Sequence, residues 1–215
     1  MNNNLLVEKI IKSTLEKFQA KYGHNPDYEN PVNQMKNIAL ISFSTNDSNN
    51  VIEPFLYTWG KMGRVLGQSG YYNWQQKCAL LINSNHDSLE VFRTMALQNT
   101  DLDEYHDEIV KLYNAFKSIV DKIAAAKVLH ILCPTFFPLW DNAIEKGLRA
   151  EYNGGCDCEP FTGHDYFAFM KCVQDLINKY NNLWISSAAF YEKGLLKIVD
   201  EYFWWSVGRP FSLVV

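Results

Sequence analysis

Apolar residues recur every three or four positions along most of this chain, and this spacing constrains its fold more than any other feature. In residues 5–22 the apolar positions are Leu5, Leu6, Ile10, Ile11, Leu15, Phe18 and Tyr22. Such spacing places the apolar side chains on one face of a helix. The chain has almost no convincing strand pattern, and no repeat at the periods of about 30–45 residues that are typical of helical solenoids. The sequence therefore predicts an all-α fold.

The same pattern predicts helices along the rest of the chain. They are expected over 54–66, 87–97, 103–122, 124–132, 142–152, 163–180 and 187–205. Residues 38–43 fit either a helix or a strand, whereas the polar run 47–50 is the clearest loop. With 215 residues, of which 47% are hydrophobic, the chain can bury a sizeable core. We expect one compact helical domain over 1–215, with seven to nine helices and room for two lobes meeting near 118–152.

Charge and composition exclude several classes of protein. Lys and Arg total 20 against 24 Asp and Glu, which gives a net charge of −4 and argues against a surface that attracts nucleic acid everywhere. No run approaches the ~20 apolar residues of a membrane helix, and the first residues do not resemble a signal peptide. We therefore expect a cytoplasmic protein with no membrane partner. Its five cysteines, an odd number, favour reduced thiols.

Residues 127–141 join two predicted helices through an apolar turn that contains two prolines. The segment reads Lys-Val-Leu-His-Ile-Leu-Cys-Pro-Thr-Phe-Phe-Pro-Leu-Trp-Asp. Lys127 lies near the start of the first helix, and Asp141 is a suitable N-cap for the second. A short, rigid connection of this kind is expected to bring the ammonium of Lys127 and the carboxylate of Asp141 to one cleft.

This pattern resembles the helix-hairpin-helix superfamily of DNA glycosylases, in particular its 8-oxoguanine glycosylase-like branch. The resemblance covers about 35 residues, 118–152. In that family a lysine on the second hairpin helix is followed by a proline-containing turn and an aspartate that caps the next helix. The resemblance implies that Lys127 attacks the sugar carbon bearing a damaged, oxidised base and forms a Schiff base. Asp141 would stabilise positive charge on the sugar, duplex DNA would be the partner, and no cofactor would be needed.

The chemistry requires these residue types, and neighbouring residues complete the predicted site. An amine can both displace a base and form an imine, while a carboxylate favours an oxocarbenium-like transition state. The amine must be neutral when it attacks, which burial or a nearby cation such as Lys122 or Arg149 would promote. The residues predicted to contact substrate are Arg64, Lys122, His130 and Trp140.

Other features leave alternatives open. Asp141 is a helix cap whatever else it does, Lys127 fits a solvated helix position, and His130 fits a bonded core histidine. The hairpin segment 120–126 holds no glycine, which with the acidic charge balance favours a non-catalytic helical binding or protein-interaction module. The aromatic C-terminus fits either a core helix or a self-association surface. Residues of metal-ligand type gather near one loop, and whether they bind zinc stays open: Cys156, Cys158, His164 and Cys172.

Overall fold

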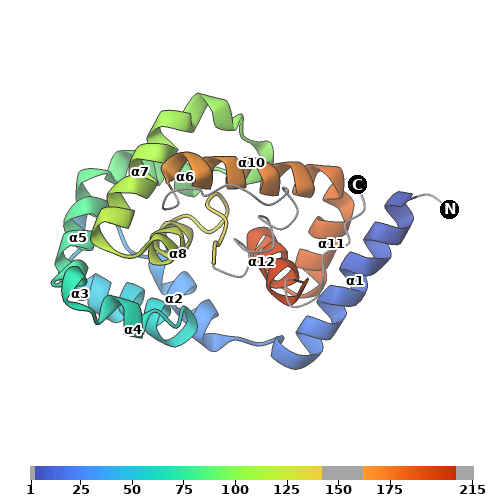
Figure 1. Cartoon of the computed structure of the whole chain (residues 1–215), viewed down its shortest axis with the longest axis horizontal. Coiled ribbons are helices and arrows are strands. Elements are labelled where there is room, and N and C mark those ends of the chain that lie inside the picture. The colour runs from blue at the N-terminus through green and yellow to red at the C-terminus, as the bar shows by residue number, and fades with distance from the viewer. Residues whose placement is uncertain (1–2, 142–161, 207–215) are drawn as a thin grey trace, which may run out of the picture.

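The computed structural model describes residues 3–141 and 162–206, and within them all regular secondary structure is helical (Figure 1). The α-helices are α1 (Asn3–Tyr22), α2 (Pro26–Met35), α3 (Thr45–Asp47), α4 (Gly63–Leu66), α5 (Trp74–Ser84), α6 (His86–Thr94), α7 (His106–Ile119), α8 (Lys122–Leu132), α10 (Gly163–Lys179), α11 (Asn181–Phe190) and α12 (Leu195–Ser206). Shorter 3₁₀ or π-helical turns are η1 (Leu40–Ser42), η2 (Ser48–Ile52), η3 (Phe55–Trp59), η4 (Ser69–Tyr71), η5 (Leu97–Asn99) and η6 (Leu102–Tyr105). The all-α prediction is confirmed.

Helix α8 is the centre of the packing. All of its residues from Ile123 to Leu132 are buried, and α2, α7 and η3 pack around it. Three consecutive alanines, 124–126, leave short side chains at the start of this helix, so its neighbours can approach its backbone closely. Any polar side chain that α8 carries is therefore held inside the molecule.

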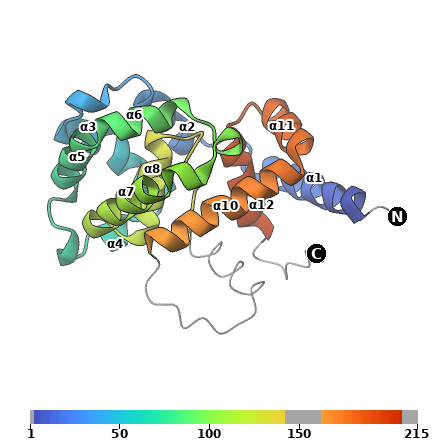
Figure 2. The same ribbon diagram turned by 90° about the horizontal axis from the view of Figure 1, so that it is seen from above.

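The helices form two groups that α10 joins. Figure 2 shows α1, α11 and α12 gathered at one end and α2 to α8 at the other. Helix α10 packs against α7 in one group and against α11 in the other. One hydrophobic cluster runs through both groups, from Ile11 on α1 to Phe203 on α12. No helix within residues 3–141 and 162–206 is long and apolar enough to cross a membrane.

Helices α7 and α8 form a hairpin whose turn needs no glycine. The turn residues are Val120 and Asp121, with φ of −125° and −68°, so neither adopts a left-handed conformation. The Asp121 carboxylate accepts a hydrogen bond from the backbone N–H of Ile123 at 2.8 Å and caps α8. The hairpin that the sequence predicted is present, and its extended turn explains how it forms without the glycine that a left-handed residue would favour.

The loop predicted over 47–50 is wrong, because this segment is helical. Ser44 and Asp47 form a capping box: the Ser44 hydroxyl accepts from the Asp47 N–H, and the Asp47 carboxylate accepts from the Ser44 N–H at 2.8 Å. This cap begins α3, which continues into η2, where Val51 and Ile52 are buried. Polar composition suggested a loop, but the cap and the apolar residues after it favour a helix.

Two other predicted helices are each divided. The segment 54–66 is interrupted between η3 and α4, where Lys61 has a φ of 54°. The segment 187–205 is divided into α11 and α12 near Glu192, which has the same φ. Left-handed residues end a helix, and the apolar periodicity that continues on both sides conceals the break. The helix expected over 142–152 lies outside the described residues.

Candidate functional site

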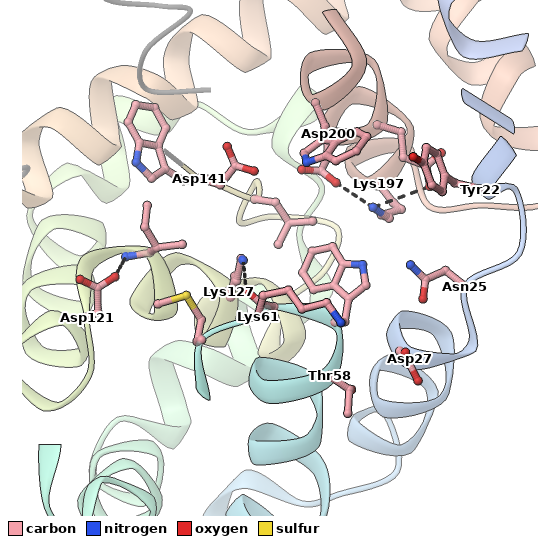
Figure 3. Close-up of a pocket in the computed structure, with 18 of the residues that line it drawn as sticks. Tyr22, Asn25, Asp27, Thr58, Lys61, Asp121, Lys127, Asp141, Lys197 and Asp200 are labelled. Carbon is pink, nitrogen blue, oxygen red and sulfur yellow. Dashed lines mark hydrogen bonds and ion pairs between the residues drawn. The ribbon is translucent and has the colours of Figure 1, made fainter. Parts of the chain in front are cut away.

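A pocket of about 800 Å³ opens between the start of α8, the face of α12 and the end of α1 (Figure 3). It receives residues from segments distant in the sequence, since α1, α2, η3, α8, the turn before Asp141 and α12 all contribute. Its described lining consists of Phe18, Tyr22, Asn25, Asp27, Thr58, Trp59, Gly60, Lys61, Met62, Val65, Asp121, Lys122, Ile123, Lys127, Leu139, Trp140, Asp141, Lys197, Asp200, Glu201 and Trp204. Lys127 and Asp141, predicted to share a cleft, both line it.

Lys127 is a buried amine at the base of this pocket. Its side chain projects from α8, the residue is 8% exposed, and Nζ donates a hydrogen bond to the Gly60 carbonyl at 2.9 Å. Nζ also lies 5.3 Å from the centre of the Trp59 ring. Burial lowers the pKa of Lys127, although the charges of Asp141 and Asp200 oppose this effect. Lowering the pKa increases the fraction of neutral amine, the form that can attack carbon.

The other lysines of the pocket differ from Lys127 in exposure or in pairing. Lys61 is exposed, and Lys122 is only partly buried at the start of α8. Lys197 is buried, but its ammonium pairs with Asp200 at 2.7 Å and with Glu201 at 3.7 Å. No carboxylate of the described residues lies within the 4.0 Å ion-pair distance of Lys127 Nζ. Lys127 is therefore the pocket lysine best suited to nucleophilic attack.

Asp141 is held by a tightly anchored turn. The Tyr166 hydroxyl donates to the Pro138 carbonyl at 2.8 Å, and the Leu97 N–H donates to the Thr135 carbonyl at 3.0 Å. Phe136 is buried and stacks on Phe92 with ring centres 4.6 Å apart. Figure 3 shows the Asp141 carboxylate on the α12 side of Lys127. A carboxylate carried by such a turn can stabilise positive charge that develops on a ligand in the pocket.

His130 was predicted to bind substrate, and the structure places it beneath the surface of the molecule, away from the described lining of the pocket. The residue is fully buried and is not among the described residues that line the pocket. Its Nδ1 donates to the Phe137 carbonyl at 2.7 Å, so its Nε2 accepts from the Tyr28 hydroxyl at 2.8 Å. Burial lowers the pKa of His130 to about 4, which keeps the ring neutral. With both nitrogens occupied, His130 braces the turn that carries Asp141.

Of the three remaining residues predicted to contact substrate, two line the pocket and one is not among its described lining residues. Lys122 and Trp140 line the pocket, and the buried Trp140 ring lies edge-on to Phe169 with centres 4.5 Å apart. Arg64 is exposed on α4 and is not among the described residues that line the pocket. The Arg64 side chain faces solvent on α4, and the spacing of basic and aromatic residues in the sequence did not reveal this.

The wall that α12 contributes was not predicted from the sequence. Lys197, Asp200 and Glu201 are all buried on this helix. The Lys193 ammonium pairs with Glu201 at 2.7 Å and donates to Gln19 of α1 at 3.0 Å, and Gln19 in turn donates to Glu201. The sequence did carry one signal of this wall: Lys197 is followed three and four positions later by Asp200 and Glu201, within an aromatic helix.

Two aromatic side chains stand at the rim of the pocket. Tyr22 is 38% exposed and Trp204 is 46% exposed, and their rings meet edge to face with centres 5.6 Å apart. Exposed aromatic rings beside a cavity offer a flat apolar surface on which a planar ligand can stack. The pocket thus combines a stacking surface with an amine and several carboxylates.

Among residues 3–141 and 162–206, no group of three or more His, Cys, Asp or Glu side chains is arranged to hold a metal ion. Cys156 and Cys158 lie outside the described residues, while His164 and Cys172 both lie on α10.

Comparisons with protein-family models, with curated proteins and with solved structures found no match to this chain. The function must therefore be argued from the pocket itself.

Proposed function

We propose that the chain is a DNA glycosylase-like enzyme that removes a damaged, oxidised base through a Schiff base on Lys127. The observation that carries this proposal is a buried lysine without an ion pair among the described residues, in one pocket with Asp141. The volume of about 800 Å³ is within the usual range of small-ligand sites and suits a nucleoside turned out of a duplex. A cytoplasmic location belongs to the same proposal.

In the proposed reaction, the neutral Lys127 amine attacks the sugar carbon that bears the base. A carbon–nitrogen bond to Lys127 forms as the glycosidic bond breaks, and the base leaves with the bonding electron pair. One amine proton passes to the departing base, and the second passes to the ring oxygen as the carbon–oxygen bond of the sugar ring breaks and the imine forms. Asp141 stabilises the positive charge on the sugar in the transition state, because an anion fixed nearby costs no reorganisation at that moment. Trp59, Trp140 or the rim aromatics would stack on the extruded base.

Borohydride trapping tests this reaction directly. Duplexes that carry 8-oxoguanine or another modified base are incubated with the native chain, with Lys127→Gln and with Lys61→Gln. Lys61 lines the same pocket but is exposed, so it controls for adventitious imine formation. We expect a covalent adduct with the native chain and Lys61→Gln, and at least a hundredfold less with Lys127→Gln. Peptide mapping should place the adduct on residue 127.

Each alternative outcome has a definite meaning. An adduct that survives in Lys127→Gln would show that another amine reacts. Trapping on abasic DNA alone does not support the proposal, since exposed amines also capture an aldehyde. No adduct with any modified duplex, from a chain whose circular dichroism shows it folded, would overturn the glycosylase assignment.

The hairpin turn favours a second candidate, a non-catalytic helical binding or interaction module. The Asp121 carboxylate occupies the Ile123 N–H, so this amide is not available to a DNA phosphate, and the carboxylate would repel one. Self-association through the aromatic C-terminal region belongs to this candidate. Light scattering across a range of concentrations tests it: a mass that rises to twice 24.9 kDa supports self-association, and a constant monomer mass opposes it.

A further inference from the structure

Two histidines from different helices meet outside the pocket lining. His106 is the first residue of α7, and His164 is the second residue of α10. Their rings lie with centres 5.2 Å apart and planes at 31°, and His106 Nε2 is 3.3 Å from His164 Nδ1. Both side chains are accessible, since His106 is half-buried and His164 is exposed. A solvent ion can therefore reach the two facing nitrogens.

A carboxylate fixes the orientation of one ring. His106 Nδ1 lies 2.8 Å from an oxygen of Asp107, so Nδ1 carries the proton that it donates to this carboxylate. In the neutral ring, Nε2 then holds a lone pair directed toward His164. A histidine whose second nitrogen donates to a carboxylate is the usual arrangement behind a zinc ligand, because the carboxylate fixes the tautomer and increases ligand basicity.

The separation of the two nitrogens suits a shared metal ion. Zinc binds histidine nitrogen at about 2.0–2.1 Å in tetrahedral geometry, which places two ligand nitrogens about 3.3–3.4 Å apart. The observed 3.3 Å agrees with this value. Without metal, His164 Nδ1 can donate its proton to His106 Nε2. When an ion replaces that proton, His164 can carry its hydrogen on Nε2 instead, so ligation needs no charged ring.

We propose that His106 and His164 form a two-histidine site for Zn²⁺ or a similar divalent transition metal, with water completing its coordination. The described residues supply no third ligand, so water is needed for the remaining positions. Both histidines lie at the positive ends of helices, which disfavours a cation. The acidic residues of the first turns there, Glu104, Asp107 and Glu108 among them, offset this effect.

Such an ion would join two elements that support the pocket. Helix α7 is the first helix of the hairpin whose second helix carries Lys127, and α10 packs along it. An ion that binds only the folded arrangement raises the stability of the fold according to its concentration relative to Kd. The site is therefore expected to act on stability, independently of any chemistry at Lys127.

Zinc binding to the chelator-treated full chain tests the proposal. Titration calorimetry with Zn²⁺ should give one ion per chain at micromolar zinc, and the same concentration should raise the thermal midpoint by several degrees. His106→Gln and His164→Gln should each abolish both effects, and Asp107→Asn should weaken binding about 10- to 100-fold. His24→Gln is the matched control, because the exposed His24 contacts a carboxylate as His106 does, with His24 Nδ1 lying 3.2 Å from an oxygen of Glu29.

Two kinds of result would contradict the proposed zinc site. Zinc binding that is unchanged in both His106→Gln and His164→Gln would place the ion elsewhere and overturn the proposal. Binding only at millimolar zinc, or equal loss in His24→Gln, would show adventitious surface binding. Because all variants replace exposed or half-exposed side chains, their metal-free midpoints should match that of the native chain and exclude misfolding.

Discussion

Lys127 and His130 lie one turn apart on the buried helix α8, and their surroundings give them different roles. The Lys127 amine has one hydrogen bond, to the Gly60 carbonyl, and retains donors and, when neutral, a lone pair. His130 has both ring nitrogens bonded, to Phe137 and Tyr28. Desolvation lowers the pKa of both residues. The difference in remaining hydrogen-bonding capacity is what makes Lys127 a candidate for chemistry and His130 a structural residue.

The stability of the fold should fall with acid because of His130. Burial lowers its pKa from 6.5 to about 4, so between these values the unfolded chain binds a proton that the folded chain does not. Stability is therefore full above pH 6.5 and is lost as the pH falls toward 4, by up to about 3 kcal/mol. Urea unfolding of native chain and His130→Asn at pH 7 and pH 4.5 measures this contribution.

The variant should be less stable at pH 7, because it leaves Tyr28 without its acceptor, but should lose less stability on acidification. His24→Gln, which removes an exposed histidine, is the control. An equal loss of stability in native chain and His130→Asn would contradict the assignment of the acid-sensitive group.

At the scale of elements, close helix contacts decide how the pocket walls are placed. Helix α10 begins at Gly163, whose N–H donates to the Asn114 side chain of α7 at 2.9 Å. A Cβ at Gly163 would lie 2.6 Å from the Val110 carbonyl oxygen and 3.0 Å from Val110 Cα. These are backbone atoms that cannot rotate away. The glycine is therefore required by the approach of α10 to α7.

Gly163→Ala should destabilise the chain by about 1–3 kcal/mol, the usual cost of forcing an extra group into a packed contact. Gly194→Ala is the matched control, because no atom lies within 4 Å of the Cβ that it would add. Chemical unfolding with urea measures both. Equal stabilities of the two variants would show that α7 and α10 do not approach each other this closely.

At the scale of the whole molecule, the continuity of the core predicts cooperative unfolding. One hydrophobic cluster joins α1 and α12 at one end to the helices around α8 at the other, and Gln19 of α1 hydrogen-bonds both Lys193 and Glu201 where α1 meets α12. Unfolding of either group of helices would expose apolar surface on the other group. The two ends are therefore expected to unfold together.

Thermal unfolding followed by far-ultraviolet circular dichroism and by tryptophan fluorescence should give coincident midpoints. Tryptophans report on both ends of the molecule, because Trp184 is buried on α11 and Trp74 on α5. Two separated transitions would indicate that α1, α11 and α12 form an independent unit, and would contradict a single domain.

Local signals were sufficient for most helices and for placing Lys127 and Asp141 at one pocket. Helix α1 was predicted from its periodicity, and α10 from the residues that begin it, where Thr162 and Asp165 form a capping box. The rigid turn between α8 and Asp141 has few conformations, so short-range sequence information was enough to place both side chains at one pocket. The loop predicted over 47–50 failed because polar residues serve as helix caps as readily as they form loops.

The sequence by itself determined that the chain is helical, because hydrophobic periodicity and capping act within a few residues. Only the tertiary structure decided which face of α12 would enclose the pocket, that His130 would be fully bonded, that Arg64 would point outward and that His106 would meet His164. Among the pairs involved, His106 and His164 lie 58 positions apart, Tyr28 and His130 102, and Gln19 and Glu201 182. Desolvation and hydrogen bonding between such distant residues arise only when the helices pack, and no local pattern specifies them.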